Sequence, residues 1–313
     1  MDPTSIAVRR GYLLVLAAAI LWGTLGIAAR IAYDTSTWDP LVVTWLRSVV
    51  AGIVCIAIAA PRLKSGVRSA GPRGVGWMAM LGVALIISQL CYLIAIDQIN
   101  INVATLIKRC GTPIVAAAIA VLLLGERFTR RLAAVMAAAF LGTWLLLSGV
   151  GEGTSSDDLV LIGVLLSVGS AVAIALHTLG SGRIARRYDA MLPLAIGFPV
   201  GALVLTPFVL ARGVDLTQSF TPWFWVIYLG AVPSALAYLL QQRGLRTVSA
   251  SHATIISLAE PLTTAILAWA VFDELLTPLG IVGGGILVVA LIVLATTPPA
   301  PHHEPLLAPV ETG

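Results

Sequence analysis

The feature that most constrains this chain is a series of apolar stretches, each close in length to a membrane-spanning helix. The hydrocarbon core of a bilayer is about 30 Å thick, and a helix of roughly 20 residues crosses it. Ten stretches fit this length, at about 11–32, 40–60, 74–96, 101–124, 131–150, 159–182, 190–211, 223–244, 251–272 and 277–296. Only 11% of the 313 residues are charged, and a helix satisfies its own backbone polar groups in lipid. We therefore predict an all-α polytopic membrane protein with ten transmembrane helices embedded in a lipid bilayer.

Basic residues are concentrated in every second connection between these stretches. With the N-terminus placed in the cytoplasm, the inner segments hold Arg9, Arg10, Arg62, Lys64, Arg68, Arg73, Arg127, Arg130, Arg131, Arg183, Arg186, Arg187, Arg243 and Arg246. The outer loops hold Arg212, with Arg30 near an outer helix end. This positive-inside bias predicts that both termini are cytoplasmic, in a cell inner (plasma) membrane. The net charge of +4 follows from this topology, so it requires no nucleic-acid partner.

The chain also repeats itself at a spacing of 148 residues. Matched pairs at this spacing are Trp77 with Trp225, Pro113 with Pro261, and Glu126 with Glu274. Because each copy contains five helices, an odd number, the second copy must enter the membrane inverted. We predict a first five-helix repeat over 1–150, an inverted repeat over 151–296, and a disordered cytoplasmic tail over 297–313. Inverted repeats are typical of secondary transporters, which hold substrate near the midplane between the repeats.

Three charged residues lie inside the predicted helices. At 1.5 Å per residue, Lys108 and Arg109 lie about 10 Å deep in the fourth stretch, and Glu260 lies about 13 Å deep in the ninth. Ionisable residues inside a membrane usually mark a functional site. A cation and a carboxylate near one midplane suit a substrate that carries both an ammonium and a carboxylate group, such as an amino acid. Lys108 or Arg109 would face the cavity; alternatively, one of them pairs with Glu260 only to lock the helices together.

Prolines and scattered polar residues add further candidates. Pro113 and Pro261 have no N–H, so we expect kinks that leave the carbonyls of Arg109 and Ser257 free to accept a hydrogen bond. Pro199 predicts a bend in the seventh stretch, which is a candidate for movement. Further candidate cavity residues are Gln89, Tyr92, His177 and Tyr238. Each of these also fits ordinary helix packing. Arg47 is interpreted as a structural or snorkelling residue.

Several of these motifs together resemble the drug/metabolite transporter superfamily. They are the ten helices, the two five-helix repeats, the Trp22–Gly23 pair in the first helix, and a proline followed thirteen residues later by Glu in each copy. The chain is most similar to the EamA-type exporters, and among them to bacterial exporters of amino acids, including aromatic ones. The resemblance covers about residues 11–296. It implies export or exchange of small metabolites by alternating access through a central cavity, and it adds Trp22 to the candidate substrate-binding residues.

Other functions find less support in the sequence. The chain has no GK[ST] phosphate-binding loop and no HExxH metal motif, and Ser181 with His177 is the nearest approach to a hydrolase pair. We therefore predict a transporter that is not an enzyme and that uses no cofactor or metal. A proton is one candidate coupling ion, and the glycine pair Gly197 and Gly201 fits a monomer or a weak dimer.

Two alternative substrates remain within transport. One is an anion or a sugar phosphate, which Lys108 and Arg109 would clamp in an exchange reaction; Glu260 would repel such a ligand. The other is a hydrophobic cationic drug, exported with Glu260 as the counter-charge.

Overall fold

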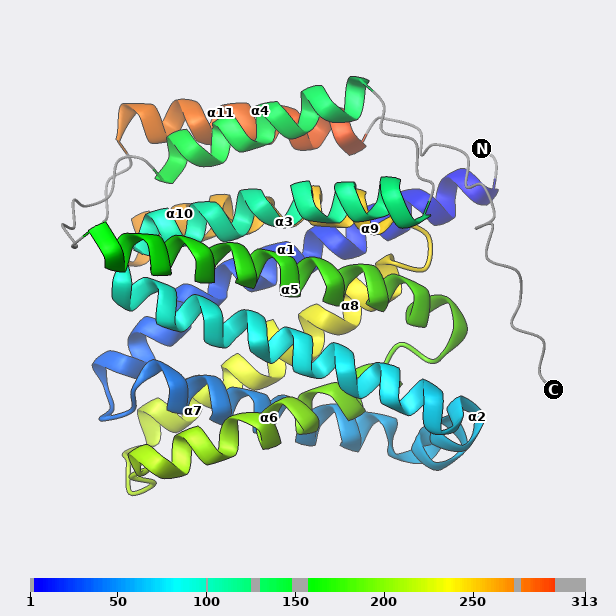
Figure 1. The fold of residues 1–313 in the computed structure, drawn as a ribbon, viewed down its shortest axis with the longest axis vertical. Helices are drawn as coiled ribbons and strands as arrows, with labels where there is room; N and C mark the ends of the chain where they lie inside the picture. The colour runs from blue at the N-terminus through cyan, green and yellow to red at the C-terminus, as the bar shows by residue number, and fades with distance from the viewer. Residues whose placement is uncertain (1–2, 100, 125–129, 148–156, 273–276, 296–313) are drawn as a thin grey trace.

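The computed structural model describes residues 3–99, 101–124, 130–147, 157–272 and 277–295, all within a bundle of helices that run roughly along one direction (Figure 1). The start of α1 and the end of α11 lie at the same end of the bundle (Figure 1). The predicted tail over 297–313 and the matched residues Glu126 and Glu274 lie outside the described residues.

The helices follow the apolar stretches closely. The first half of the chain forms α1 (Pro3–Asp34), α2 (Pro40–Gln98), α3 (Ile101–Leu124) and α4 (Arg130–Leu147). The second half forms α5 (Asp157–Arg187), α6 (Leu192–Arg212), α7 (Phe220–Leu229), the π-helical η1 (Gly230–Leu236), α8 (Ala237–Gly244), α9 (Ala250–Ile256), α10 (Ala259–Phe272) and α11 (Pro278–Ala295). Within α2, Gly71 has φ 63° and ψ 177°, so two helices join there. With α7–η1–α8 and α9–α10 each taken as one interrupted helix, the described helices match the ten predicted stretches.

The internal repeat is visible in the helix boundaries. Both ends of α11 lie 148 residues after the corresponding ends of α4. The last residue of α10, Phe272, likewise lies 148 residues after the last residue of α3, Leu124. The spacing of these boundaries equals the 148-residue spacing of the matched residues, so the described helices of the two halves follow one plan here.

The two halves differ where the second one is interrupted. The helix of α3 continues through Pro113, whereas its counterpart breaks at Ser257 and Leu258, between α9 and α10. A π-helical turn surrounds Pro233, while the position 148 residues earlier is Leu85, inside the regular helix of α2. The helix of α6 also continues through Pro199.

The prediction that Pro261 leaves the Ser257 carbonyl free is wrong. The Glu260 backbone N–H donates to that carbonyl at 3.1 Å. Because the chain leaves the α-helix before the proline, a tighter turn supplies the donor that Pro261 lacks.

The surface of the bundle is apolar and part of its interior is polar, which is the reverse of a soluble protein. Large apolar side chains such as Leu122, Leu203 and Phe220 are strongly exposed, whereas Lys108, His177 and Glu260 are buried. Six described helical stretches are long and apolar enough to cross a membrane, and one of them, Pro40–Ala95, includes the joint at Gly71. The chain is an all-helical polytopic membrane protein.

Glycine contacts hold neighbouring helices close together. Gly142 of α4 faces Gly283 of α11, and a Cβ added at Gly142 would lie 2.7 Å from the Gly283 carbonyl oxygen. Together, α4 and α11 form a layer at one end of the long axis (Figure 1). Similarly, Gly197 of α6 packs against the backbone of Gly82 of α2, and Gly201 of α6 packs against Ile86 of α2. The small residues noted in the sequence therefore serve packing within one chain.

Candidate functional site

An ion pair joins the two halves of the chain inside the bundle. Arg109 of α3 donates through Nη2 to Oε1 of Glu260, in the first turn of α10. The Glu260 residue is only 7% exposed. The break between α9 and α10 places this carboxylate at a helix N-terminus, where free backbone N–H groups favour negative charge. The structure thus brings together two of the charges that the sequence singled out.

Lys108 points to a different partner. Its Nζ lies 4.3 Å from the centroid of the Tyr92 ring, and the Tyr92 hydroxyl hydrogen-bonds Thr105 at 2.7 Å. Adjacent residues of a helix point about 100° apart, because one turn takes 3.6 residues. Lys108 therefore makes a cation–π contact, while Arg109 is the cation paired with Glu260. The sequence could not separate these two roles.

Arg47 of α2 belongs to the same group of charges. Its charge acts on Glu260, on Lys108 and on the Tyr238 hydroxyl. We predicted a structural or snorkelling role for Arg47 from the sequence, although its position within an apolar stretch was a signal of function. Within the described part of the chain, three basic side chains thus lie within electrostatic range of one buried carboxylate.

Aromatic rings surround Tyr238 of α8 beside these charges. The Tyr238 ring makes edge contacts with Trp22 of α1 at 5.0 Å, with Phe198 of α6 at 5.5 Å and with His177 of α5 at 5.8 Å between ring centroids. Trp22 is buried, and its Nε1–H has no hydrogen-bond partner among the described residues. A buried donor without a partner is costly, so this N–H is available to an acceptor on a bound molecule.

Gly23 explains how α1 reaches this centre. A Cβ added there would lie 2.4 Å from Cβ of Thr263 and 3.1 Å from the Glu260 carbonyl oxygen. The Thr264 hydroxyl also donates to the Gly23 carbonyl at 3.0 Å. The absence of a side chain at Gly23 therefore lets α1 touch α10 next to Glu260, with Trp22 held against Tyr238.

The π-helical turn η1 was not anticipated from the sequence, although Pro233 within an apolar stretch was a usable signal. The Ser234 hydroxyl donates to the Leu229 carbonyl at 2.8 Å and satisfies a backbone acceptor in the irregular turn. A Cβ added at Gly230 would lie 2.9 Å from the Arg47 carbonyl oxygen. Because π-helical turns are frequent at functional sites, the position of η1 against α2 at Arg47 places it with the candidate site.

The remaining predicted residues lie at varied distances from the charges. Gln89 is half-buried on α2, three residues before Tyr92. Pro113 and Pro261 are buried, and Pro199 of α6 packs against Gly52 of α2. Among the described residues there is no cluster of His, Cys, Asp and Glu that could hold a metal ion.

At the opposite end of the bundle from the start of α1, hydrogen bonds connect the α1–α2 corner with the α6–α7 loop. We call this set the corner network: Thr37, Trp38, Asp39, Arg212, Asp215 and Gln218. Arg212 donates to Asp39 at 2.9 Å, Trp38 Nε1 donates to the Asp215 carbonyl at 2.7 Å, and Gln218 Nε2 donates to Thr37 at 2.8 Å. Hydrogen bonds from Thr217 hold the pKa of Asp215 below its usual value.

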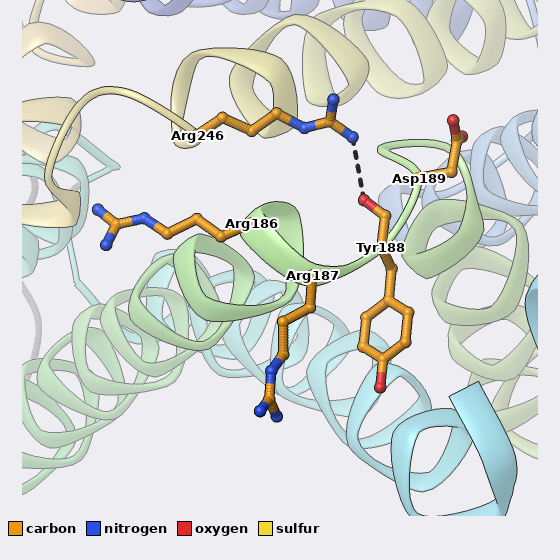
Figure 2. Close-up of a pocket in the computed structure, with 5 residues that line it drawn as sticks. All are labelled: Arg186, Arg187, Tyr188, Asp189 and Arg246. Carbon is orange, nitrogen blue, oxygen red and sulfur yellow. Dashed lines mark hydrogen bonds between the residues drawn. The ribbon is translucent and has the colours of Figure 1, made fainter. Parts of the chain in front are cut away.

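Exposed arginines lie at the start of α1 (Arg9, Arg10) and at the ends of α5 (Arg186, Arg187) and α8 (Arg243), and we call this end of the bundle the arginine-rich end. A hollow lies there, between the α5–α6 and α8–α9 connections. Its lining residues are Arg186, Arg187, Tyr188, Asp189 and Arg246 (Figure 2). Arg246 donates to the carbonyls of Ala185 at 2.9 Å and Tyr188 at 3.0 Å, so it ties the α8–α9 connection to the end of α5. The three arginine side chains point in different directions (Figure 2), so they do not converge on one anion.

Comparison with known proteins gives a consistent result. The model of the EamA-like transporter family matches residues 9–148 and again residues 161–296. The chain is 30% identical to the Bacillus subtilis protein named "Uncharacterized transporter YwfM", over 88% of this chain and 90% of that protein. It is 26% identical to the Salmonella typhimurium "Uncharacterized inner membrane transporter YicL", over 83% of this chain and 86% of that protein. A solved crystal structure superposes with a TM-score of 0.77 at 21% identity, covering 90% of this chain and 95% of that one, which is a likeness of fold.

Proposed function

Because the chain belongs to the EamA-like transporter family, and is therefore a secondary transporter of small molecules, we propose that it exports or exchanges neutral amino acids, aromatic ones included. The observation that carries this proposal is the Arg109–Glu260 pair between the two halves of the chain, with Lys108 and Arg47 as further cations. A zwitterionic amino acid replaces that internal pair with two pairs of its own. Its carboxylate meets a cation, and its ammonium meets Glu260.

The surroundings of the charges fit the rest of such a substrate. Trp22, Phe198 and Tyr238 form an aromatic wall, and the Trp22 N–H offers a free donor. Apolar walls discriminate weakly between similar side chains, because one methylene is worth about 1–3 kcal/mol. We therefore expect transport of several large neutral amino acids. Movement of the two halves about this centre would open it to each side in turn.

The arginine-rich end is assigned to the cytoplasm in this proposal. Exposed arginines occur at the start of α1 and at the ends of α5 and α8, as the positive-inside rule requires. The relative from Salmonella typhimurium is named an inner membrane transporter, which supports the same membrane for this chain. The repeats span about 1–150 and 151–296, in a monomer or a weak dimer.

The excess of cations favours a second candidate function, exchange of anions such as sugar phosphates. Three cations act on one carboxylate, so a doubly charged anion would also be attracted. Glu260 opposes this reading because it would repel a phosphate. The same excess of positive charge argues against hydrophobic cationic drugs as substrates.

Counterflow in liposomes tests the proposal. Purified protein in vesicles loaded with unlabelled phenylalanine should accumulate labelled phenylalanine from outside. Other large neutral amino acids should compete, whereas the matching 2-oxo acids, which lack the ammonium group, should not. Stronger competition by sugar phosphates would favour the second candidate and contradict the first.

The Glu260→Gln variant sharpens this test, because it removes the partner of the ammonium and keeps the cations. Phenylalanine counterflow should fall at least tenfold, whereas the 2-oxo acid should compete better than it does in the wild type. If competition by phenylalanine and competition by its 2-oxo acid fell equally in Glu260→Gln, the assigned role of Glu260 would be contradicted.

A further inference from the structure

Lys108 of α3 is a buried ammonium group without a charged partner. Only 7% of the residue is exposed. Within the described residues, no carboxylate lies within ion-pair distance of its Nζ and no group accepts a hydrogen bond from it, so its polar contact is the face of the Tyr92 ring, at 4.3 Å. The buried carboxylate of Glu260 is held by Arg109 instead. An ammonium group carries three N–H donors, and buried donors without an acceptor are costly. Lys108 is therefore ready to take an acceptor from a bound molecule.

The ring beneath Lys108 is fixed in place by a hydrogen bond between two helices. The hydroxyl groups of Tyr92 on α2 and Thr105 on α3 lie 2.7 Å apart. Thr105 comes three residues before Lys108, so both lie on one face of α3. One turn away on α2, Ser88 exchanges hydrogen bonds with Ser170 of α5, and its hydroxyl is therefore already engaged. The Tyr92–Thr105 bond thus positions the contact that Lys108 makes in the empty protein.

The internal repeat shows that the fold does not need these polar groups. The positions 148 residues after Tyr92, Thr105 and Lys108 are all apolar: Leu240, Ala253 and Ile256. Ala253 and Ile256 are buried in an apolar cluster. The same helical plan therefore packs without a hydroxyl or a cation at these positions. A role in packing alone does not explain why the first half carries them.

The chemistry of an amino acid assigns the free cation a ligand. Its ammonium and carboxylate groups are attached to one carbon atom, so their two receptors in the protein must lie close together. Glu260 is in contact with Arg109, the neighbour of Lys108, so a ligand whose ammonium meets Glu260 brings its carboxylate beside α3. We propose that Lys108 holds the carboxylate of the substrate, and that Tyr92, positioned by Thr105, holds the Lys108 ammonium until the substrate arrives. This inference rests on the proposed function, because it places one end of the amino acid whose other end Glu260 binds.

Lysine NMR tests the change of partner without transport, because the chain contains two lysines, Lys64 and Lys108. Protein labelled with ¹³C at the lysine Cε should give two side-chain signals in detergent, and Lys108→Met should remove one of them. The Lys108 signal should lie upfield of the other, because the face of the Tyr92 ring shields nuclei above it. Phenylalanine should move it toward the position of the exposed Lys64. The amine 2-phenylethylamine, which lacks the carboxylate, should leave it in place.

Equilibrium binding in detergent measures carboxylate recognition as the ratio of the dissociation constants of 2-phenylethylamine and phenylalanine. Wild-type protein should prefer phenylalanine at least tenfold, because Lys108 meets the carboxylate. In Lys108→Met this preference should fall to about threefold or less. A lost preference in Arg47→Gln with a retained one in Lys108→Met would place the carboxylate at Arg47 and overturn the proposal.

The positioning role of Tyr92 and Thr105 has its own test. Tyr92→Phe and Thr105→Val each remove the hydrogen bond and keep the shape of the side chain. Each should raise the KM for phenylalanine counterflow about 3- to 10-fold, the effect of one hydrogen bond, with the maximal rate within about twofold of wild type. The double variant should match the single ones, because all three lose the same bond.

Thr143→Val is the matched control for these variants. This buried hydroxyl of α4 bonds to the Ala139 carbonyl of its own helix, so the wild-type KM should persist. An unchanged KM in both Tyr92→Phe and Thr105→Val would show that their bond only packs α2 on α3, and would overturn the positioning role.

Failure of this inference differs from failure of the proposed function. Wild-type counterflow with an unmoved Lys108 signal, or with a wild-type preference in Lys108→Met, overturns the role of Lys108 and leaves the proposed function intact. Absence of phenylalanine counterflow in the wild type, together with an unmoved Lys108 signal, overturns the proposed function and this inference with it.

Discussion

At the scale of single residues, two adjacent cations of α3 have separate partners, and this makes them separable by mutation. Arg109→Met leaves the buried Glu260 without its ion-pair partner, and breaking a buried pair costs about 3–5 kcal/mol. The Arg109 side chain keeps 30% of its exposure, so we expect the lower end of that range. Lys108→Met removes a cation–π contact, which costs about 0.5–2 kcal/mol. Thermal unfolding in detergent should therefore show a larger loss for Arg109→Met, while both variants lose counterflow.

The double variant Arg109→Met/Glu260→Gln distinguishes a binding pair from a purely structural one. With neither charge left alone, the protein should regain most of its thermal stability. If the pair binds substrate, counterflow should remain absent. Full transport by this stable double variant would show that the pair only locks α3 to α10.

At the scale of the helix, Gly23 is the residue that permits contact between α1 and α10. A Cβ added by Gly23→Ala would come within 2.4 Å of Thr263 Cβ, and such overpacking costs about 1–3 kcal/mol. Gly26, one turn further along α1, is the matched control, because a Cβ there would meet Thr264 at an ordinary 3.5 Å. Gly23→Ala should lower thermal stability and counterflow, whereas Gly26→Ala should leave both near wild type. Equal losses in the two variants would show that α1 tolerates an added methyl group at neither glycine, and would contradict a special role for the contact of Gly23 with α10.

The same scale shows what the sequence could and could not predict. The lengths of the apolar stretches were enough to predict the helices, because lipid allows few other structures for such stretches. The sequence did not locate the helix break at Ser257 and Leu258. Pro261 indicates a disturbance nearby, but it does not indicate which turn leaves the α-helical conformation. The partner of Glu260 was left open as well. Helical periodicity separates Lys108 from Arg109 by about 100°, yet only the packing of α3 shows which direction faces α10.

At the scale of the whole molecule, the repeat predicts that equivalent positions face opposite sides of the membrane. Ser69, near the Gly71 joint, and Thr217, in the α6–α7 loop, are exposed residues separated by the repeat spacing of 148. In a protein without other cysteines, Ser69→Cys and Thr217→Cys should react with a membrane-impermeant maleimide from opposite sides. In cells whose plasma membrane is intact and accessible to the reagent, only Thr217→Cys should react. Reaction of both from one side would contradict the inverted arrangement.

The two ends of the molecule are closed by different kinds of contact. At the arginine-rich end, α1 packs on α8 at backbone level, where a Cβ added at Gly11 would lie 3.2 Å from the Gly244 carbonyl oxygen. At the opposite end, the corner network joins the halves through polar contacts, and the Arg212 side chain of its ion pair is 63% exposed. Exposed pairs contribute little to stability, because water competes for both charges. The end that carries the corner network should therefore open to water at a lower cost in free energy than the arginine-rich end.

This difference gives a last prediction, for the balance between closed and open forms. An exposed ion pair contributes about 0.2–1 kcal/mol, so Arg212→Gln should raise the population open at the opposite end by about 1.4- to 5-fold. Cys91 reports this opening, because it is half-buried on α2 within electrostatic range of Lys108. With Cys55 and Cys110 replaced by alanine, maleimide should label Cys91 faster from that end in Arg212→Gln. Arg30→Gln is the comparison variant, because it removes one cation that pairs with Asp34 of its own helix and leaves the Arg212–Asp39 pair of the corner network in place. Equal acceleration in both variants would show that surface charge, and not the corner network, controls access to the centre.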